Sequence, residues 1–412
     1  MFASVAGTQT LCQLLNGLAA FLLIRMLPKD QYAWFTIATA MAAVLNALSE
    51  GGIGTAVLSV GGKVWQERPR LSALVHASLG MLKRLSIVGT LLTLPAMVWL
   101  LHQQDAPWTV LILLCVLVLC PQWMATRTVL LGMVNRLQSR LWQLQSAELT
   151  QAGLRFTLTV LPGLYGVAHV LWAATAVALG VVAQGVLVRK QVWPLLEREV
   201  SPEAVEEFRP QVTSTVRRMY PSVAFNCVQS QIAIWLLGAL GSSSEVADIG
   251  ALARLAFVAN LAGAPLSLIV APAFARCHDT RRLCRMFTGL MGAYVLFYLS
   301  LIVAALFQAP WILKLFGPSY GHLSHELLLY TFSLALAGLN GICWTLNLAR
   351  GWLGYFWLTI PISIVTQGTT FFFIEVQTVD GAIWLGIILN AGYLLHSLAI
   401  SIQGFRRDTS AL

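Results

Sequence analysis

Long apolar runs recur from one end of this 412-residue chain to the other. Each is about 20 residues or longer, which is the length that a helix needs to cross the hydrocarbon core of a bilayer. The pattern predicts twelve membrane-spanning helices, over residues 3–27, 31–60, 78–101, 107–134, 141–162, 167–189, 215–239, 245–274, 285–308, 322–349, 352–374 and 380–404. The expected fold class is therefore an all-α polytopic membrane protein.

A polar stripe interrupts the apolar pattern at matching places in the two halves of the chain. Three side chains at i, i+4 and i+7 share one helix face each time. They are Gln9, Gln13 and Asn16 in the first helix, and Ser222, Asn226 and Gln229 in the seventh. The helices that follow hold Asn46 and Asn260 at corresponding positions. Two bundles with inward polar faces predict two pseudo-symmetric six-helix lobes, a design typical of transporters.

The longest polar stretch, 189–218, lies midway between the two sets of helices. It predicts an N-terminal six-helix lobe over 1–189, a cytoplasmic linker over 190–214 and a C-terminal six-helix lobe over 215–412. Within the linker, Ser201, Pro202 and Glu203 have the cap, the proline and the acid of a helix start. A short amphipathic helix is expected there, either as a hinge or partner contact or as a plain linker on the membrane.

Composition and charge fit this topology. With 58% hydrophobic and 10% charged residues, the chain cannot form a soluble globule. Most of its 26 basic residues fall in one set of alternate loops and at the C-terminus. This asymmetry is the positive-inside rule, and it predicts that both termini lie in the cytoplasm of a multi-pass protein of the bacterial inner membrane. The net charge of +9 is thus explained by topology, and no nucleic-acid partner is expected.

Cysteine and histidine spacing predicts neither a metal site nor a cofactor. The seven cysteines fall in spans or cytoplasmic loops, without a CxxC pair. His322, His325 and Glu326 form the string HxxHE, which is not a zinc-protease motif.

Several short segments resemble a known family. Residues 25–35 read RMLPKDQYAWF and lead into a helix that ends LSEGGIGTA at residues 48–56, with Ala33 where glycine is usual. Residues 245–255 (EVADIGALARL) repeat the pattern loosely, and 315–320 (LFGPSY) are similar to the loop before the tenth helix. The chain thus resembles the bacterial Wzx-type oligosaccharide flippases of the MOP superfamily, which also contains the MATE multidrug exporters and the lipid II flippases.

The resemblance implies a fold and a function. The fold would be the MATE-like one, with twelve helices in two V-shaped lobes. The function would be movement of undecaprenyl-diphosphate-linked oligosaccharide units from the cytoplasmic to the outer leaflet, for the biosynthesis of O-antigen, capsule or exopolysaccharide. Expected partners are this lipid-linked oligosaccharide, membrane lipids, and the polysaccharide polymerase and chain-length proteins.

A diphosphate head and sugars cannot cross dry hydrocarbon, so a flippase needs a polar, cationic cavity at membrane depth. The fifth predicted helix meets this need with a stripe on one face: Gln145, Glu148, Gln151, Arg155 and Thr159. The planar guanidinium of Arg155 suits phosphate oxygens. Pairing with another helix, or reaching to the interface, is the simpler alternative for Arg155 and Glu148.

Other candidates follow the same logic. Arg254 and Arg127 lie inside spans and either reach the cavity or snorkel, and Arg25 either binds substrate or caps a helix end. Asn226 and Gln229 are expected to line the cavity.

Asn340, Trp344 and Asn347 share a face of the tenth helix and would contact sugars or pack against a helix. Glu148 and Glu50 are the ion-coupling candidates, although Glu50 lies near a helix end, where water would solvate it.

Three alternatives remain. A MATE-like cation-coupled multidrug exporter would favour acidic cavity residues, whereas three arginines lead the candidates here. A polytopic glycan polymerase or ligase would usually have a substantial outward loop with catalytic residues, and the predicted outward loops are short. A structural membrane subunit would not need buried charges. The sequence therefore favours a transporter that works by alternating access, not an enzyme.

Overall fold

The computed structural model describes residues 2–138, 140–164, 169–197, 200–257, 270, 274, 277, 279–350, 352, 358–375 and 377–410. Helices dominate these residues, and none of them forms a strand. Contacts between residues divide the chain into two compact units, Met1–Ala247 (unit 1) and Asp248–Leu412 (unit 2). The lobe boundaries predicted at residues 189 and 215 stay a prediction.

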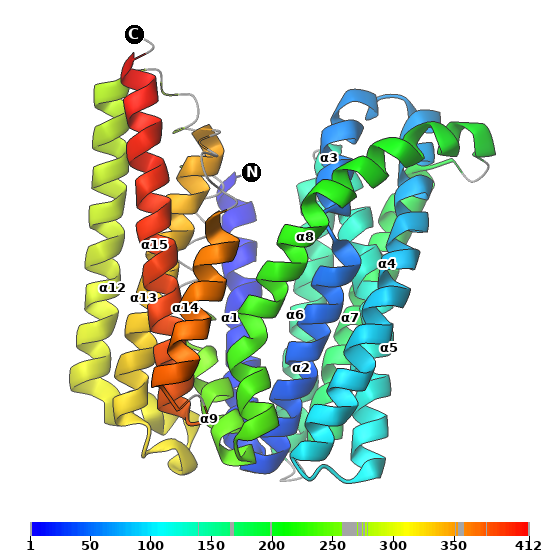
Figure 1. Cartoon of the computed structure of the whole chain (residues 1–412). Coiled ribbons are helices and arrows are strands. Elements are labelled where there is room, and N and C mark those ends of the chain that lie inside the picture. The colour runs from blue at the N-terminus through cyan, green and yellow to red at the C-terminus, as the bar shows by residue number, and fades with distance from the viewer. Residues whose placement is uncertain are drawn as a thin grey trace. The chain divides into compact units, whose positions relative to one another are not determined.

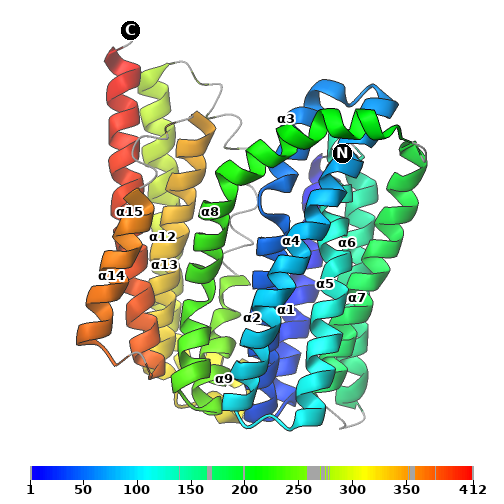
Figure 2. The ribbon, with the colours of Figure 1, turned by 45° about the vertical axis from the view of Figure 1, so that its right-hand side comes forward.

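Unit 1 is a bundle of long helices (Figures 1 and 2). Its helices are α1 (Phe2–Met26), α2 (Lys29–Glu50), α3 (Ile53–Val64), α4 (Arg68–Gln103), α5 (Trp108–Leu137), α6 (Leu141–Leu164), α7 (Val170–Val192), the short η1 (Trp193–Leu195) and α8 (Pro202–Leu240). Helix α9 (Ser243–Ala253) runs across the unit boundary. Unit 2 contains α12 (Thr280–Phe316), η3 (Pro318–Tyr320), α13 (Ser324–Arg350), α14 (Thr359–Phe373) and α15 (Val379–Ser410).

Nine helices of the described part of the chain are long and apolar enough to cross a membrane, from Gly7–Met26 to Val379–Arg407. Each predicted span that falls within the described residues lies on a single helix, except that over 31–60, which is divided between α2 and α3. Helix α6 is not among the nine because its polar stripe lowers its hydropathy. Much of the span predicted over 245–274, including Asn260, lies outside the described residues. The chain is thus a multi-pass membrane protein.

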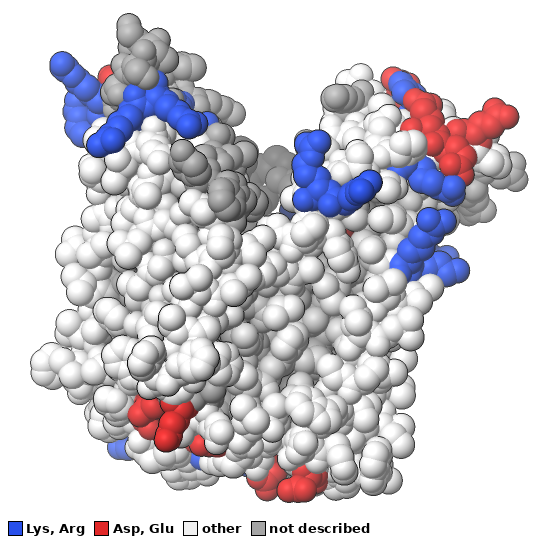
Figure 3. All heavy atoms as spheres, viewed as in Figure 1, with Lys and Arg blue, Asp and Glu red and all other residues white. Residues whose placement is uncertain are grey.

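Charged side chains gather at the ends of the helices. On the face seen in Figure 3, Lys and Arg lie mainly toward one end of each unit, and a broad band without charged side chains follows. Large apolar residues such as Leu91, Val116, Leu296 and Phe307 are exposed along the helices. An apolar band of this kind is the surface that a bilayer requires.

The span predicted over 31–60 is broken at two glycines. Gly51 and Gly52 both adopt left-handed conformations, with φ of 51° and 91°, which end α2 and allow α3 to begin. A Cβ atom on Gly51 would lie 2.8 Å from Leu85 and 2.9 Å from Tyr220. The carboxylate of Glu50 accepts hydrogen bonds from the backbone nitrogens of Gly52 (2.9 Å) and Gly54 (2.8 Å). Glu50 therefore caps the start of α3.

The helix start predicted at Ser201–Pro202–Glu203 is present. The Ser201 hydroxyl accepts a hydrogen bond from the Ala204 nitrogen at 3.2 Å. The helix does not stop as a short linker helix would, but continues through Pro210 and Pro221 to Leu240. Its first turns lie across the end of α3 before the helix bends to run beside α2 (Figures 1 and 2). The bend is expected, because internal prolines remove backbone hydrogen bonds.

Candidate functional site

A polar pocket lies inside unit 1, between α2, α5, α6 and α7. Its volume is about 350 Å³. Its polar lining is Asn46, Gln122, Thr128, Arg136, Glu148, Gln151 and Gln184. Such a concentration of amides and charges is costly among membrane-spanning helices, and it marks a candidate ligand or ion site.

A second, more apolar hollow of about 190 Å³ adjoins this pocket. The two share four lining residues: Asn46, Gln122, Val177 and Val181. The polar part lies toward Arg136, near the end of α5. The apolar part extends along α2 to Thr39 and Phe35. The two adjoining hollows thus combine a polar part beside Arg136 with a mainly apolar part along α2.

Glycines hold the helices around the pocket close together. A Cβ atom on Gly180 of α7 would lie 3.1 Å from the Gln151 carbonyl oxygen of α6, and one on Gly185 would lie 2.6 Å from Met124 of α5. Small residues allow this close approach in membrane helix bundles. The sequence of α7 therefore positions Gln151 and Gln184 at the pocket wall.

The pocket combines opposite charges with neutral amides. Arg136 of α5 and Glu148 of α6 line the same hollow. A guanidinium can donate several hydrogen bonds to phosphate or carboxylate oxygens, whereas amides can both donate to and accept from sugar hydroxyls. Glu148 can exchange a proton or bind a monovalent cation. The arrangement suits binding and release of a polar ligand.

Arg155 belongs to the same polar stripe of α6 as Glu148 and Gln151, but its side chain contacts α1. Its Nη1 donates to Asn16 Oδ1 at 3.4 Å, and Asn16 Nδ2 donates to the Cys12 carbonyl at 3.0 Å. One residue of the stripe predicted on the first helix thus pairs with one of the stripe predicted on the fifth, across the α1–α6 contact. This is the inter-helix pairing that was the simpler alternative for Arg155.

The other predicted arginines lie elsewhere. Arg25 is exposed in the last turn of α1, as a residue near a helix C-terminus would be. Arg127 is exposed on the face of α5 opposite the pocket. Arg254 is half-buried, in the turn that follows α9. The structure therefore does not bring Arg25 or Arg127 to the pocket of unit 1.

The stripe on α8 is also separate from the pocket lining. Asn226 is exposed, and its Nδ2 donates to Ser222 Oγ of the same stripe at 3.4 Å. Gln229 is half-buried one turn further along.

In unit 2, the predicted sugar-contacting residues form a helix-packing seam. Ser397 Oγ donates to Asn340 Oδ1 at 2.6 Å, and Ser401 Oγ donates to Asn347 Oδ1 at 2.7 Å. Asn347 Nδ2 also donates to the Ser397 carbonyl at 2.9 Å, and Asn347 is fully buried. Interhelical hydrogen bonds of this kind join α13 to α15. The geometry favours packing for both asparagines, whereas Trp344 is half-buried.

Sequence reasoning missed four polar residues of the pocket, namely Gln122, Thr128, Arg136 and Gln184. Gln122 and Gln184 are amides in the middle of predicted spans, and Arg136 counted only as a basic residue of a loop. A lone amide inside an apolar run is the signal that could have found the two glutamines, because such a side chain needs a polar partner in hydrocarbon.

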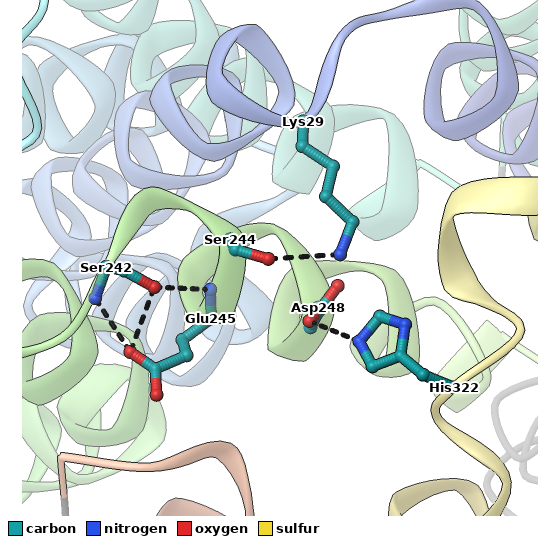
Figure 4. Close-up of polar contacts among 6 residues, drawn as sticks. All are labelled: Lys29, Ser242, Ser244, Glu245, Asp248 and His322. Atoms are coloured by element: carbon teal, nitrogen blue, oxygen red, sulfur yellow. Dashed lines mark hydrogen bonds and ion pairs between the residues drawn. The ribbon is translucent and has the colours of Figure 1, made fainter.

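Figure 4 shows polar contacts around α9. In unit 1, Lys29 Nζ donates to Ser244 Oγ at 3.0 Å, and the Glu245 carboxylate accepts from the Ser242 nitrogen at 2.7 Å. In unit 2, the buried Asp248 carboxylate lies 3.0 Å from His322 Nε2. Glu245 and Asp248 belong to the segment 245–255 that carries part of the family resemblance.

The chain shares its fold with solved membrane transporters. An inward-facing multidrug resistance MATE family transporter of the MOP superfamily has 15% identity and a TM-score of 0.65, over 97% of this chain and 95% of that one. The lipid II flippase MurJ has 11% identity and a TM-score of 0.74, over 98% and 90%. A MOP superfamily transporter from Pyrococcus furiosus has 14% identity and a TM-score of 0.53, over 98% and 93%.

The fold is therefore the one that these transporters share, in a multi-pass membrane protein. The family model described as polysaccharide biosynthesis protein matches residues 2–278, so the chain belongs to that family. This confirms the family resemblance found in the sequence and the predicted all-helical, MATE-like fold class. A search of curated proteins found no match.

Proposed function

We propose that this protein is a flippase that moves undecaprenyl-diphosphate-linked oligosaccharide units from the cytoplasmic to the outer leaflet by alternating access. The observation that carries the proposal is the pocket with Arg136, Glu148 and four amides, enclosed by helices of a polysaccharide biosynthesis family member. The lipid II flippase with the same fold supports the choice of a lipid-linked substrate.

The proposed division of labour follows from the chemistry of the side chains. Arg136, near the end of α5, attracts the anionic head of the substrate. The amides of Gln122, Gln151 and Gln184 form hydrogen bonds with the polar groups of the head and so replace the water that the head loses. Glu148 serves as the acid that exchanges a proton or cation. Arg155 and Arg254 remain candidates for later contacts with the diphosphate along its path.

The membrane potential supplies part of the energy. Outward movement of an anionic head from a negative cytoplasm gains about 2.3 kcal/mol per charge for each 100 mV. The lipid tail stays in the bilayer throughout, so only the head needs a polar path.

Deletion of the gene followed by lipid analysis tests the proposal. Lipid-linked glycan should accumulate in the cytoplasmic leaflet, and a copy with Arg136→Ala should fail to relieve the accumulation at normal protein levels. Arg140→Ala is the matched control, because Arg140 is exposed and does not line the pocket. Normal glycan transfer in the deletion strain would reject the flippase.

A second candidate function is cation-coupled export of drugs. The fold of a MATE multidrug transporter and the acid Glu148 within the pocket favour it. Drug hypersensitivity of the deletion strain with unchanged glycan, restored by the native gene but not by Glu148→Gln, would select this function over the first.

A further inference from the structure

Another hollow of unit 1, separate from the two described above, lies on the outside of the helix bundle, between α4 and α5. It has a volume of about 340 Å³ and an almost entirely apolar lining. The residues that form its walls include Leu94 of α4 and Val116, Leu119 and Cys120 of α5. Val116 and Leu94 are 51% and 38% exposed, so the groove opens toward the surface of a membrane-spanning pair of helices.

One hydrogen bond sets the register of the two helices along this groove. Trp123 Nε1 of α5 donates to Thr90 Oγ1 of α4 at 3.1 Å. The helices run in opposite directions, because only a short turn joins Gln103 to Trp108. Residues before Thr90 in α4 therefore lie at the same end of the groove as residues after Trp123 in α5.

Beyond the groove, at the end before Thr90 and after Trp123, each helix carries a basic residue on the same face that lines the groove. Lys83, Ile87, Thr90 and Leu94 share one face of α4, and Val116, Cys120, Trp123 and Arg127 share one face of α5, each set at i, i+4, i+7 and i+11. Lys83 and Arg127 are both exposed. Among the described residues, neither forms an ion pair or a side-chain hydrogen bond.

The position of Arg127 calls for an anion that its side chain can reach, and the described residues supply none. Arg127 lies ten residues before the end of α5 at Leu137, or about 15 Å along the axis at 1.5 Å per residue. A cation on the lipid-facing side at such a depth is costly unless it reaches an anion at the interface. Lipid phosphates lie at that interface.

We propose that this groove is a binding site for an anionic membrane phospholipid, with one acyl chain between α4 and α5 and the phosphate held by Arg127 and Lys83. The polar atoms of Thr90 and Trp123 bond to each other, so the groove offers little to a sugar. A phospholipid with a small head therefore fits better than a lipid-linked oligosaccharide. This site is distinct from the pocket between α2, α5, α6 and α7, and it does not depend on the proposed transport function.

Photocrosslinking of the full chain in vesicles tests the site. Phosphatidylglycerol with a diazirine on its acyl chain, at a low fraction in phosphatidylethanolamine, should label the peptide that contains Val116–Trp123. Lys83→Gln and Arg127→Gln should each reduce labelling about fivefold, which corresponds to about 1 kcal/mol per basic residue. Arg84→Gln is the matched control, since Arg84 is exposed but belongs to the hollow next to α8.

Two further measurements distinguish binding of the acyl chain in the groove from recognition of the head group. Cys120→Phe keeps both cations but fills the groove, so it should abolish labelling of this peptide in folded protein, as checked by circular dichroism and gel filtration. Excess unlabelled phosphatidylglycerol should compete, and lipid-linked oligosaccharide should not. Equal labelling by phosphatidylcholine, an equal effect of Arg84→Gln, or displacement by the glycolipid alone would overturn the proposal.

Discussion

At the scale of single residues, the same residue type has different roles that depend on the helix face. Glu50 caps a helix through two backbone nitrogens, whereas Glu148 lines a pocket opposite Arg136. Asn46 points to that pocket, whereas Asn347 is fully buried in a packing seam. Intramembrane polar residues therefore divide into those that complete the structure and those that are available to a ligand.

Glu148→Gln is expected to remove coupling to the ion gradient and to leave folding intact. Glutamine keeps the shape of the side chain but can neither release a proton nor attract a cation. Transport of lipid-linked oligosaccharide into sealed vesicles, measured with and without a proton or sodium gradient, checks this expectation. Full stimulation by the gradient in the variant would contradict it. Glu50→Gln serves as a comparison, because Glu50 is engaged in capping α3.

Asn347→Ala is expected to reduce stability and to leave substrate preference unchanged. The substitution leaves the Ser401 hydroxyl and the Ser397 carbonyl without their amide partner. Interhelical hydrogen bonds in membranes contribute about 1 kcal/mol, so the melting temperature in detergent should fall by a few degrees. Thr345→Ala is the control, since the Thr345 hydroxyl donates to the Gly341 carbonyl of its own helix. A change in glycan preference at unchanged stability would assign Asn347 to the substrate instead.

At the scale of elements, close contacts of helices depend on glycines at a few positions. Gly338 of α13 leaves room for the hydroxyl of Tyr298 of α12, and Gly404 of α15 leaves room for Trp352. Tyr298 and Trp352 both belong to the apolar core of unit 2. The hydrogen bonds of the polar seam join α13 to α15. The contact of Gly338 with Tyr298 brings α13 close to α12.

Gly338→Ala is expected to destabilise unit 2, because the new methyl group would overlap the Tyr298 ring. Overpacking of this kind typically costs about 1–3 kcal/mol. Gly341→Ala in the same helix is the matched control, since no other part of the described structure comes within 4 Å of its added Cβ, apart from its own stretch of helix. Thermal unfolding in detergent should separate the two variants. Equal melting temperatures would show that α12 and α13 are not packed as described.

At the scale of the whole molecule, charge and hydropathy agree with a protein that crosses the membrane many times. Basic residues lie toward one end of each unit, and apolar residues are exposed between the ends (Figure 3). The positive-inside rule then predicts a cytoplasmic location for the ends that carry Arg217 and Arg218 in unit 1 and Arg406 and Arg407 in unit 2.

Reporter fusions test this orientation. Green fluorescent protein joined to the C-terminus should fluoresce, and alkaline phosphatase at the same site should be inactive, because both reporters would remain in the cytoplasm. Phosphatase joined after Gln104, in the short turn between α4 and α5, should be active. Activity of the phosphatase at the C-terminus would place that end outside and would contradict the predicted orientation.

The sequence alone determined the membrane-spanning helices, the polar stripes, the helix start at Ser201 and the family. These features are local, because the bilayer demands a certain length of apolar residues and backbone hydrogen bonds within each helix. The tertiary structure alone decided that Gln122, Arg136 and Gln184 meet Glu148, that Asn347 pairs with Ser401, and that Arg127 faces outward. Such outcomes depend on how helices distant in sequence cross, and that is set by packing at a few small residues rather than by any local pattern.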